Sequence, residues 1–168
     1  GTLSDMMQAP LFPVPPETFR ARVEFHDFAC GETLYPSPEI SLQTAPLNHP
    51  NGACGYRINF DGRSICYITD TEHYPEGRDP AVVDLVRDAD IMIYDATYTE
   101  EEYPRFVGFG HSTWQEAVRV ADAANVKTLV LFHHEPTHTD DIMDQIAADV
   151  AKVRPGTEVA REGMILRP

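Results

Sequence analysis

Polar side chains with metal-binding chemistry follow several hydrophobic runs of this sequence. His49, Asp70 and His133 each stand at or just beyond the end of such a run. Imidazole nitrogens and carboxylate oxygens are the usual protein donors to zinc and iron. The three residues are therefore candidate ligands of a metal site, with His133 preferred over its neighbour His134 because the apolar run ends at Phe132.

Each candidate also has an ordinary structural explanation. A histidine at a strand end is more often a solvated or capping side chain than a ligand, and Asp70 is placed to cap the turn that begins at Thr71. Taken one at a time, the residues leave both interpretations open. His26, His73 and His138 have no supporting partner in the sequence, and we expect them at the surface.

The first half of the chain has the pattern of antiparallel β structure. Arg22–Phe28 alternates polar and apolar residues, as a half-buried strand does, and Glu39–Leu47 predicts a second strand. Gly55–Phe60 and Arg63–Thr69 flank Asp61-Gly62, and Asp-Gly between apolar runs is the strongest short signal of a hairpin. We therefore expect hairpins before the site at Asp70.

The second half alternates helices and strands, which places the chain in the α+β class. Asp79 is an N-cap followed by proline at the first helical position, and Thr113 with Glu116 forms a capping box. Trp114 lies on the apolar face of the helix that follows and is expected in the core. The predicted elements are a helix from Asp79 to about Arg87, a strand at Ile91–Tyr94, a helix after Thr113, a strand at Thr128–Phe132, a helix from Asp140 or Asp141, and a strand at Glu158–Leu166.

Length, charge and hydropathy exclude several classes of protein. The 168 residues can form a single domain, residues 1–168, with a proline-rich extended arm at residues 1–20. No apolar run reaches the roughly 18 residues that span a bilayer, so no membrane partner is expected, and the start lacks the features of a secretory signal. The net charge of −14 argues against general nucleic-acid binding, because affinity for the phosphate backbone comes from Lys and Arg.

The cysteines predict no disulfide framework. Cys30, Cys54 and Cys66 form no CxxC pair, and their number is odd. Cys66 lies in an apolar run, where a buried structural thiol is expected. A reducing cytoplasm fits this cysteine usage best.

The ordered motifs resemble those of the metallo-β-lactamase-fold hydrolases, especially their ribonuclease Z-like phosphodiesterase branch. The resemblance runs from about Phe12 to Met164 and matches the C-terminal half of that fold. It implies a partial αββα sandwich, with antiparallel hairpins followed by alternating β and α, and a metal site at one edge between the sheets. It also implies a divalent metal cofactor, with zinc preferred and manganese or iron as alternatives.

The same resemblance assigns roles to the candidate residues. His49 and His133 match metal ligands, and Asp70 matches the carboxylate that bridges two metals in the family. Asp95 and His111 match a carboxylate–histidine pair in which the carboxylate orients an imidazole that protonates the leaving oxygen. Many members carry Glu where this chain has Asp95, and the shorter side chain would weaken the pair. The implied reaction is phosphodiester hydrolysis by a metal-activated water.

The family's first metal motif, HxHxDH, is absent from this sequence. Catalytic zinc usually has three protein ligands or more, so we expect weak metal binding and poor catalysis by this chain alone. Three explanations stay open: the sequence begins inside a longer enzyme, it is a truncated non-catalytic paralogue that binds a partner, or a second chain completes the site. Because a half-sandwich exposes one face of its sheet, we expect a homo-oligomer.

The substrate class follows from what the sequence lacks. No inserted basic arm of the kind that grips tRNA is present, so a small phosphodiester or cyclic nucleotide is the better candidate. A lactamase or thioesterase of the same superfamily is less favoured, because Asp95 and His111 fit the phosphodiesterase branch better.

Overall fold

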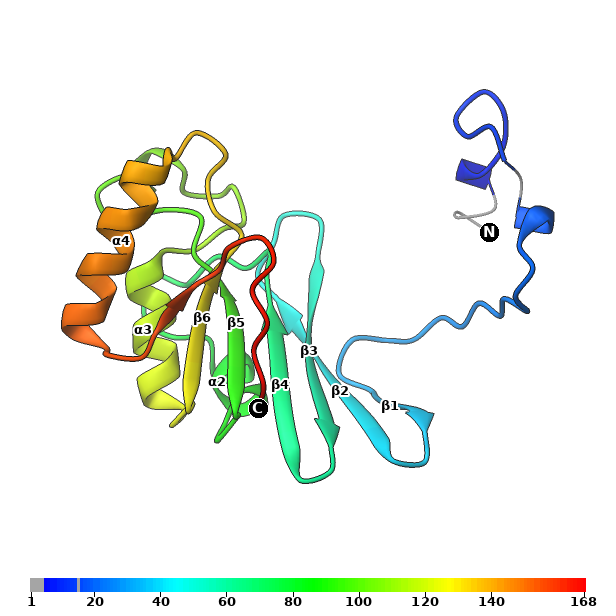
Figure 1. Ribbon diagram of the computed structural model, residues 1–168, viewed down its shortest axis with the longest axis horizontal. Helices are drawn as coiled ribbons and strands as arrows, with labels where there is room; N and C mark the ends of the chain where they lie inside the picture. Colours follow the sequence, from blue (N-terminus) through cyan, green and yellow to red (C-terminus); the bar gives the residue numbers. More distant parts are fainter. Residues whose placement is uncertain (1–4, 15) are drawn as a thin grey trace.

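A mixed sheet is the frame of the protein (Figure 1). The computed structural model describes residues 5–14 and 16–168, and in this part of the chain the sheet has seven strands in the order β1-β2-β3-β4-β5-β6-β7. Neighbours are antiparallel from β1 to β4 and parallel from β4 to β7. The strands are β1 (Thr33–Ser37), β2 (Ile40–Leu47), β3 (Ala53–Phe60), β4 (Arg63–Ile68), β5 (Ile91–Asp95), β6 (Thr128–Phe132) and β7 (Glu158–Val159), and the helices are η1 (Pro16–Thr18), α2 (Pro80–Leu85), η2 (Tyr103–Arg105), α3 (Trp114–Ala123) and α4 (Asp140–Val153).

Local turn and cap signals determine where most of these elements begin and end. The predicted hairpin is confirmed: β3 pairs antiparallel with β4, and both turn residues, Asp61 and Gly62, have positive φ values of 48° and 71°. The Thr113 hydroxyl accepts a hydrogen bond from the Glu116 N–H at 3.1 Å and caps α3. Asp79 caps α2 in the same way. Such caps satisfy backbone donors that a helix leaves unpaired, which is why they mark helix starts.

Helices α2, α3 and α4 cover one face of the sheet, and the main hydrophobic core lies between (Figure 1). Cys66 on β4 is fully buried there as predicted, and burial raises the pKa of its thiol to about 11. Trp114 is partly buried and packs against the same core. Among the residues that the structure describes, none of the helices combines the length and hydrophobicity that crossing a membrane demands.

The opposite face of the sheet is only partly covered. The C-terminal segment crosses in front of β5 and β4 in Figure 1, and beside it a groove of about 330 Å³ is lined by Tyr67, Phe132 and Met164 among others. Farther along this face, Ile58 and Phe60 of β3 remain 40% and 51% exposed. Alternation along the strands thus buries one set of side chains under the helices and leaves the other set open.

Self-association through this open face is our first testable prediction, because large exposed apolar surfaces usually mark interfaces. At micromolar concentration the chain should sediment as a dimer or a larger assembly, and Phe60→Asp should shift it towards the monomer. The control is Leu11→Asp, since Leu11 is 75% exposed but lies in the N-terminal segment. A wild-type chain that sediments as a compact monomer contradicts the prediction.

Two predicted strands differ from the structure. Arg22–Phe28 is not a strand: residues 22–29 have no regular secondary structure and are exposed, and β1 lies at Thr33–Ser37 instead. Alternation shows which face a strand would bury, but it does not show whether a neighbour is there to pair with. The last strand is also shorter than predicted, because β7 includes only Glu158–Val159 of the expected Glu158–Leu166.

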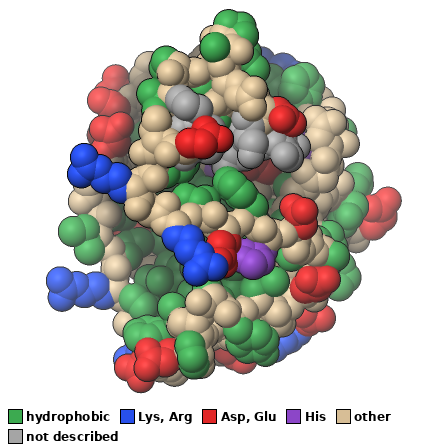
Figure 2. Space-filling model, turned by 90° about the vertical axis from the view of Figure 1, so that its right-hand side faces the viewer, with side chains coloured by type: hydrophobic (Ala, Val, Ile, Leu, Met, Phe, Trp, Pro, Cys, Tyr) green, Lys and Arg blue, Asp and Glu red, His purple; other side chains and the backbone are tan. Residues whose placement is uncertain are grey.

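The N-terminal segment lies beyond β1, at the end of the sheet farthest from α4 (Figure 1). Figure 2 looks at this end of the molecule and shows hydrophobic side chains on the surface, and Phe12, Phe19 and Phe25 are 44%, 46% and 59% exposed. The predicted proline-rich arm belongs to this segment, except for residues 1–4 and 15, which lie outside the described residues.

A disulfide that the cysteine count did not predict joins Cys30 to Cys54. It links the segment before β1 to β3, across 24 positions of sequence, with the two Cα atoms 6.1 Å apart. The expectation of no disulfide was therefore wrong. An odd count leaves one thiol over, here the buried Cys66, and says nothing against pairing of the other two.

Asp90, just before β5, anchors the edge of the sheet opposite the candidate site. Its carboxylate accepts hydrogen bonds from Lys127 Nζ at 2.7 Å and from the Ser64 N–H at 2.8 Å, and its side chain is 7% exposed. These bonds lower the pKa of Asp90 from 3.8 to about 2, although burial opposes the shift. A carboxylate whose folded pKa is depressed stabilises the fold above its unfolded pKa, and this contribution is lost as the pH falls through the folded value.

We therefore expect Asp90→Asn to lower the free energy of unfolding by about 2 kcal/mol near pH 7. The difference from wild type should shrink as the pH falls from about 4 towards about 2, because Asp90 increasingly takes up a proton and becomes uncharged, as Asn is at every pH. Urea unfolding at a series of pH values measures this, with the exposed Asp61→Asn as control. A penalty that is the same at all pH values would show that the charge of Asp90 does not matter.

Candidate metal centre

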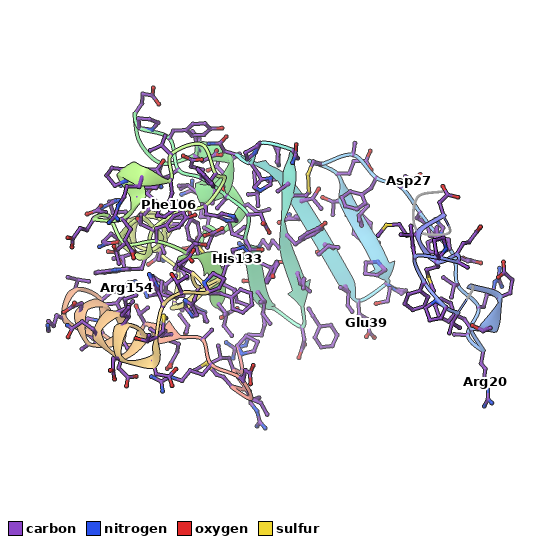
Figure 3. The ribbon with its side chains drawn as sticks, turned by 90° about the horizontal axis from the view of Figure 1, so that it is seen from above. Arg20, Asp27, Glu39, Phe106, His133 and Arg154 are labelled. Carbon is purple, nitrogen blue, oxygen red and sulfur yellow. A yellow bond between two sulfur atoms is a disulfide. The ribbon has the colours of Figure 1, made fainter. Side chains whose placement is uncertain are left out.

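Four strands point their carboxyl ends at the same edge of the sheet. β2 and β4 run in the same direction because both are antiparallel to β3 between them, and β5 and β6 are parallel to β4. His49, Asp70, Asp95 and His133 stand at or just after these four ends. Figure 3 looks down on this edge, with His133 near the middle of the molecule. The topology thus brings together side chains that are distant in sequence.

The side chains form one cluster with His111. His49, Asp70 and His111 each offer a ligand atom within 4.8 Å of the others, and so do Asp95, His111 and His133. The ring centroids of His111 and His133 are 4.9 Å apart, and His133 Nε2 lies 3.7 Å from Asp70 Oδ1. All five residues singled out in the sequence therefore meet at this edge, while their individual roles stay predictions.

Asp70 and His133 share an unusual backbone conformation. Both have positive φ values, 62° and 60°, in the left-handed region that residues other than glycine rarely adopt. Each follows the end of a strand, so the left-handed residue turns the chain away from the sheet and leaves its side chain at the edge. Such conformations cost of order 1 kcal/mol or more and concentrate at functional sites.

Asp95 is fully buried and holds the cluster together. Its Oδ2 accepts a hydrogen bond from the Asp70 N–H at 3.0 Å and lies 2.9 Å from His111 Nδ1. Its Oδ1 accepts from the Thr97 hydroxyl at 2.8 Å and from the Ser112 N–H at 3.2 Å. One carboxylate therefore fixes the loop after β4, the loop before α3 and the ring of His111.

The contact with Asp95 also favours the protonated form of the His111 ring. Its hydrogen bond with Asp95 raises the pKa of His111, which burial alone would lower, and the negative charges of Asp95 and Asp70 add to the increase. Because Nδ1 faces Asp95, Nε2 is the ring nitrogen available to a bound molecule. An imidazole with a raised pKa retains its proton at higher pH, as a general acid must.

The donor set fits a divalent cation. Two imidazoles and a carboxylate are the ligand types of catalytic zinc sites, and the side chains of Asp70 and His133 are 43% and 36% exposed, so an ion can reach them. His49 Nδ1 is buried and has no hydrogen-bond partner among the described residues. No hydrogen bond to Nδ1 therefore orients the His49 ring in the described part of the chain.

Two histidines expected at the surface lie inside instead. The His138 side chain is only 3% exposed, and its Nε2 lies 2.8 Å from Glu102 Oε1. His73 is half-buried, with Nδ1 3.0 Å from the Ser112 hydroxyl. His26 is exposed as predicted, with 81% of its side chain accessible. The partners of these two rings lie more than 30 positions away in the chain, so no local sequence pattern predicts the contacts.

Comparison with known proteins identifies relatives of this chain over much of its length. A family model described as "Beta-lactamase superfamily domain" matches residues 3–134. Ribonuclease Z from Brevibacillus brevis is 33% identical over 103 residues, which cover 59% of this chain and 31% of that protein. Among solved structures, the metallo-β-lactamase-fold protein YhfI from Bacillus subtilis has a TM-score of 0.71 at 19% identity, covering 89% of this chain and 58% of that chain. Zinc-bound PqqB from Methylobacterium extorquens has a TM-score of 0.60 at 18% identity, covering 84% and 55%.

These matches confirm the α+β fold expected from the sequence, a mixed sheet of the metallo-β-lactamase type. The chain spans about a third of the length of the ribonuclease Z relative and rather more than half of the two solved structures. The family model covers well over half of the chain. This chain belongs to the metallo-β-lactamase superfamily, with ribonuclease Z-like proteins among its relatives.

Proposed function

We propose that this chain supplies part of a divalent-metal centre that hydrolyses a small phosphodiester. The observation that carries the proposal is the meeting of His49, Asp70 and His133 with the Asp95–His111 pair at one edge of the sheet. The ribonuclease names of its relatives support a phosphodiester as the substrate class, and the zinc-bound PqqB structure supports a metal in this fold.

The residues divide the work between them. His49, Asp70 and His133 would hold the cation, with zinc preferred and manganese or iron as alternatives. A divalent cation lowers the pKa of a nearby water and offsets the charge that builds on a phosphoryl group. His111 would donate a proton from Nε2 to the leaving oxygen, and Asp95 would keep the ring oriented and its pKa raised.

The acidic surface favours a small substrate. A net charge of −14 repels a long polyanion, whereas a compact phosphodiester or cyclic nucleotide meets mainly the local field of the site. We therefore propose a small diester over tRNA. Binding of the metal is expected to be weak, because few of its ligands come from this chain.

The test is metal content and turnover on one sample. The chain is equilibrated with a series of Zn²⁺ or Mn²⁺ concentrations, the bound metal is measured by equilibrium dialysis so that weak binding is also detected, and turnover of bis(4-nitrophenyl) phosphate is assayed at each concentration. His26→Ala is the control, since this ring is exposed and outside the cluster. Stoichiometric metal with turnover supports the proposal. No bound metal and no turnover supports the alternative, a non-catalytic chain that binds a partner or itself.

A further inference from the structure

Glu72 is a buried carboxylate two residues beyond Asp70, with no role yet assigned. It is 7% exposed. Its Oε1 accepts hydrogen bonds from the Tyr103 hydroxyl and the Gly108 N–H, both at 2.7 Å. Its Oε2 accepts from the Gly108 N–H at 3.0 Å and from the Gly110 N–H at 2.9 Å. The side chain therefore binds the loop that leads to His111 at several points.

The backbone of Glu72 binds a second loop, the one that carries His49. The Glu72 N–H donates to the Asn48 carbonyl oxygen at 2.8 Å, and Asn48 Nδ2 donates back to the Glu72 carbonyl oxygen at 2.9 Å. One residue thus connects the loop after β2 with the loop before α3. The contacts of the Glu72 carboxylate with Gly108 and Gly110 are the stronger part of this connection, because hydrogen bonds to an ionised carboxylate are among the stronger ones in proteins.

The two loops meet where Gly110 touches the His49 ring. A Cβ atom at Gly110 would lie 2.3 Å from His49 Cδ2 and 2.7 Å from Pro50 Cδ, so only a hydrogen fits there. The φ value of Gly110 is 89°, which also requires glycine. The N–H of this same glycine is held by Glu72, and the next residue is His111.

We propose that Glu72 is a positioning residue that sets the spacing between His49 and His111. It holds the Gly110 backbone against the His49 ring and so fixes the two rings 5.9 Å apart, centroid to centroid. The proposal rests on the proposed function in one respect, that these two histidines belong to the site.

Glu72 is not offered as a ligand. Both of its oxygens are already used by N–H and O–H donors, and neither group of candidate ligand residues in the described chain contains it. Its effect on a bound metal must therefore pass through the loop. This distinguishes it from Asp70, whose carboxylate faces the other ligands.

Glu72→Gln tests the proposal, because the amide keeps the length of the side chain but turns an NH2 group towards an N–H donor. Hydrogen–deuterium exchange of the segment 103–111 should become about tenfold faster, and affinity for Co²⁺ should fall about tenfold, as for other residues that orient ligands. The visible absorption of bound Co²⁺ should change as well. Tyr103→Phe is the matched control: it removes one donor to Glu72 but leaves the contacts with Gly108 and Gly110, so affinity should change less than about twofold.

The outcomes separate this proposal from the proposed function. If wild type binds Co²⁺ and Glu72→Gln binds it equally, with the same spectrum, the positioning role is overturned and the metal site stands. If wild type binds no Co²⁺, the metal site fails. The positioning role is then judged by hydrogen–deuterium exchange alone: faster exchange of residues 103–111 in Glu72→Gln supports it, and unchanged exchange overturns it.

Gly110→Ala is the second test, in case Glu72→Gln does not fold. Its methyl group would push the His49 ring away while the carboxylate of Glu72 is intact. We expect a loss of Co²⁺ affinity similar to that of Glu72→Gln. Full affinity in Gly110→Ala would overturn the claim that contact with Gly110 places His49.

Discussion

Asp70→Ala is expected to lose bound metal and turnover together. Its carboxylate shares one group of ligand atoms with His49 and His111, and its Oδ1 also lies 3.7 Å from His133 Nε2. Without it the proposed ligands are reduced to the imidazoles of His49 and His133, and no carboxylate faces the ion from this position. We expect metal affinity to fall by about 100-fold or more, at least as much as for residues that act only by orienting ligands.

His111→Ala is the companion variant, because His111 belongs to both groups of candidate ligands. If the ring donates a proton and does not hold the ion, the variant should keep its metal and lose turnover by about 10² to 10⁴-fold. Metal content and hydrolysis of bis(4-nitrophenyl) phosphate are measured on both variants. Loss of metal in His111→Ala would make the ring a ligand, and full activity in Asp70→Ala would refute the assignment of the site.

Loss of a metal ligand can be distinguished from unfolding in the Asp70 variants. The Asp70 side chain is 43% exposed, so its removal opens no cavity in the core. Alanine in this left-handed backbone conformation should lower the free energy of unfolding by only of order 1 kcal/mol. Asp70→Asn, which keeps the shape and tolerates this backbone better, should lose metal with an almost unchanged melting temperature. A variant that loses metal only because it unfolds would show itself in the melting curve.

The fold was predictable where local chemistry sets the boundaries. The Asp61-Gly62 turn and the caps at Asp79 and Thr113 depend on neighbouring residues alone, and each lies where the sequence placed it. β1 and the shape of the chain before it were not predictable, because strand pairing depends on partners elsewhere. Arg22–Phe28 has the alternation of a strand, but within the described residues it pairs with no other strand.

The candidate site was predictable for a related reason. His49, Asp70 and His133 follow hydrophobic runs, and the ends of parallel strands meet at one edge of a sheet, so their meeting could be expected from the sequence, whereas the Asp95–His111 pair came from the family resemblance. Glu72 had no such sign. The partners of its side chain lie 31 to 38 positions away, on a loop whose path no local pattern reveals.

The greatest combined loss of stability and activity is expected at Asp95. Both of its oxygens have several partners. Oδ2 accepts hydrogen bonds from the backbone N–H groups of Asp70 and Thr71 and faces the His111 ring. Oδ1 accepts hydrogen bonds from Thr97 and from the Ser112 N–H. Asp95→Ala would leave these buried donors without an acceptor. At about 1–3 kcal/mol for each unsatisfied group, a loss of 4 kcal/mol or more in the free energy of unfolding is expected, about the scale measured for broken buried networks.

Asp95→Asn sharpens the argument, because no orientation of the amide satisfies both sides. Whichever way it turns, its NH2 group faces N–H donors, so about 2–3 kcal/mol should be lost although the volume is unchanged. Asp95→Glu keeps an acceptor on both sides and adds one methylene, for which overpacking costs about 1–3 kcal/mol. His111→Ala removes only one of the partners and should be the most stable variant of the series.

Urea unfolding and turnover on these variants separate the two roles of Asp95. If it holds the loops as well as the ring, Asp95→Asn loses stability and turnover, whereas His111→Ala loses mainly turnover. An Asp95→Asn protein as stable as wild type but inactive would mean that the carboxylate acts on His111 alone. The loops after β4 and before α3 would then be fixed by other contacts, and Glu72, which lies in the loop after β4 and binds Gly108 and Gly110 of the loop before α3, would be the first candidate.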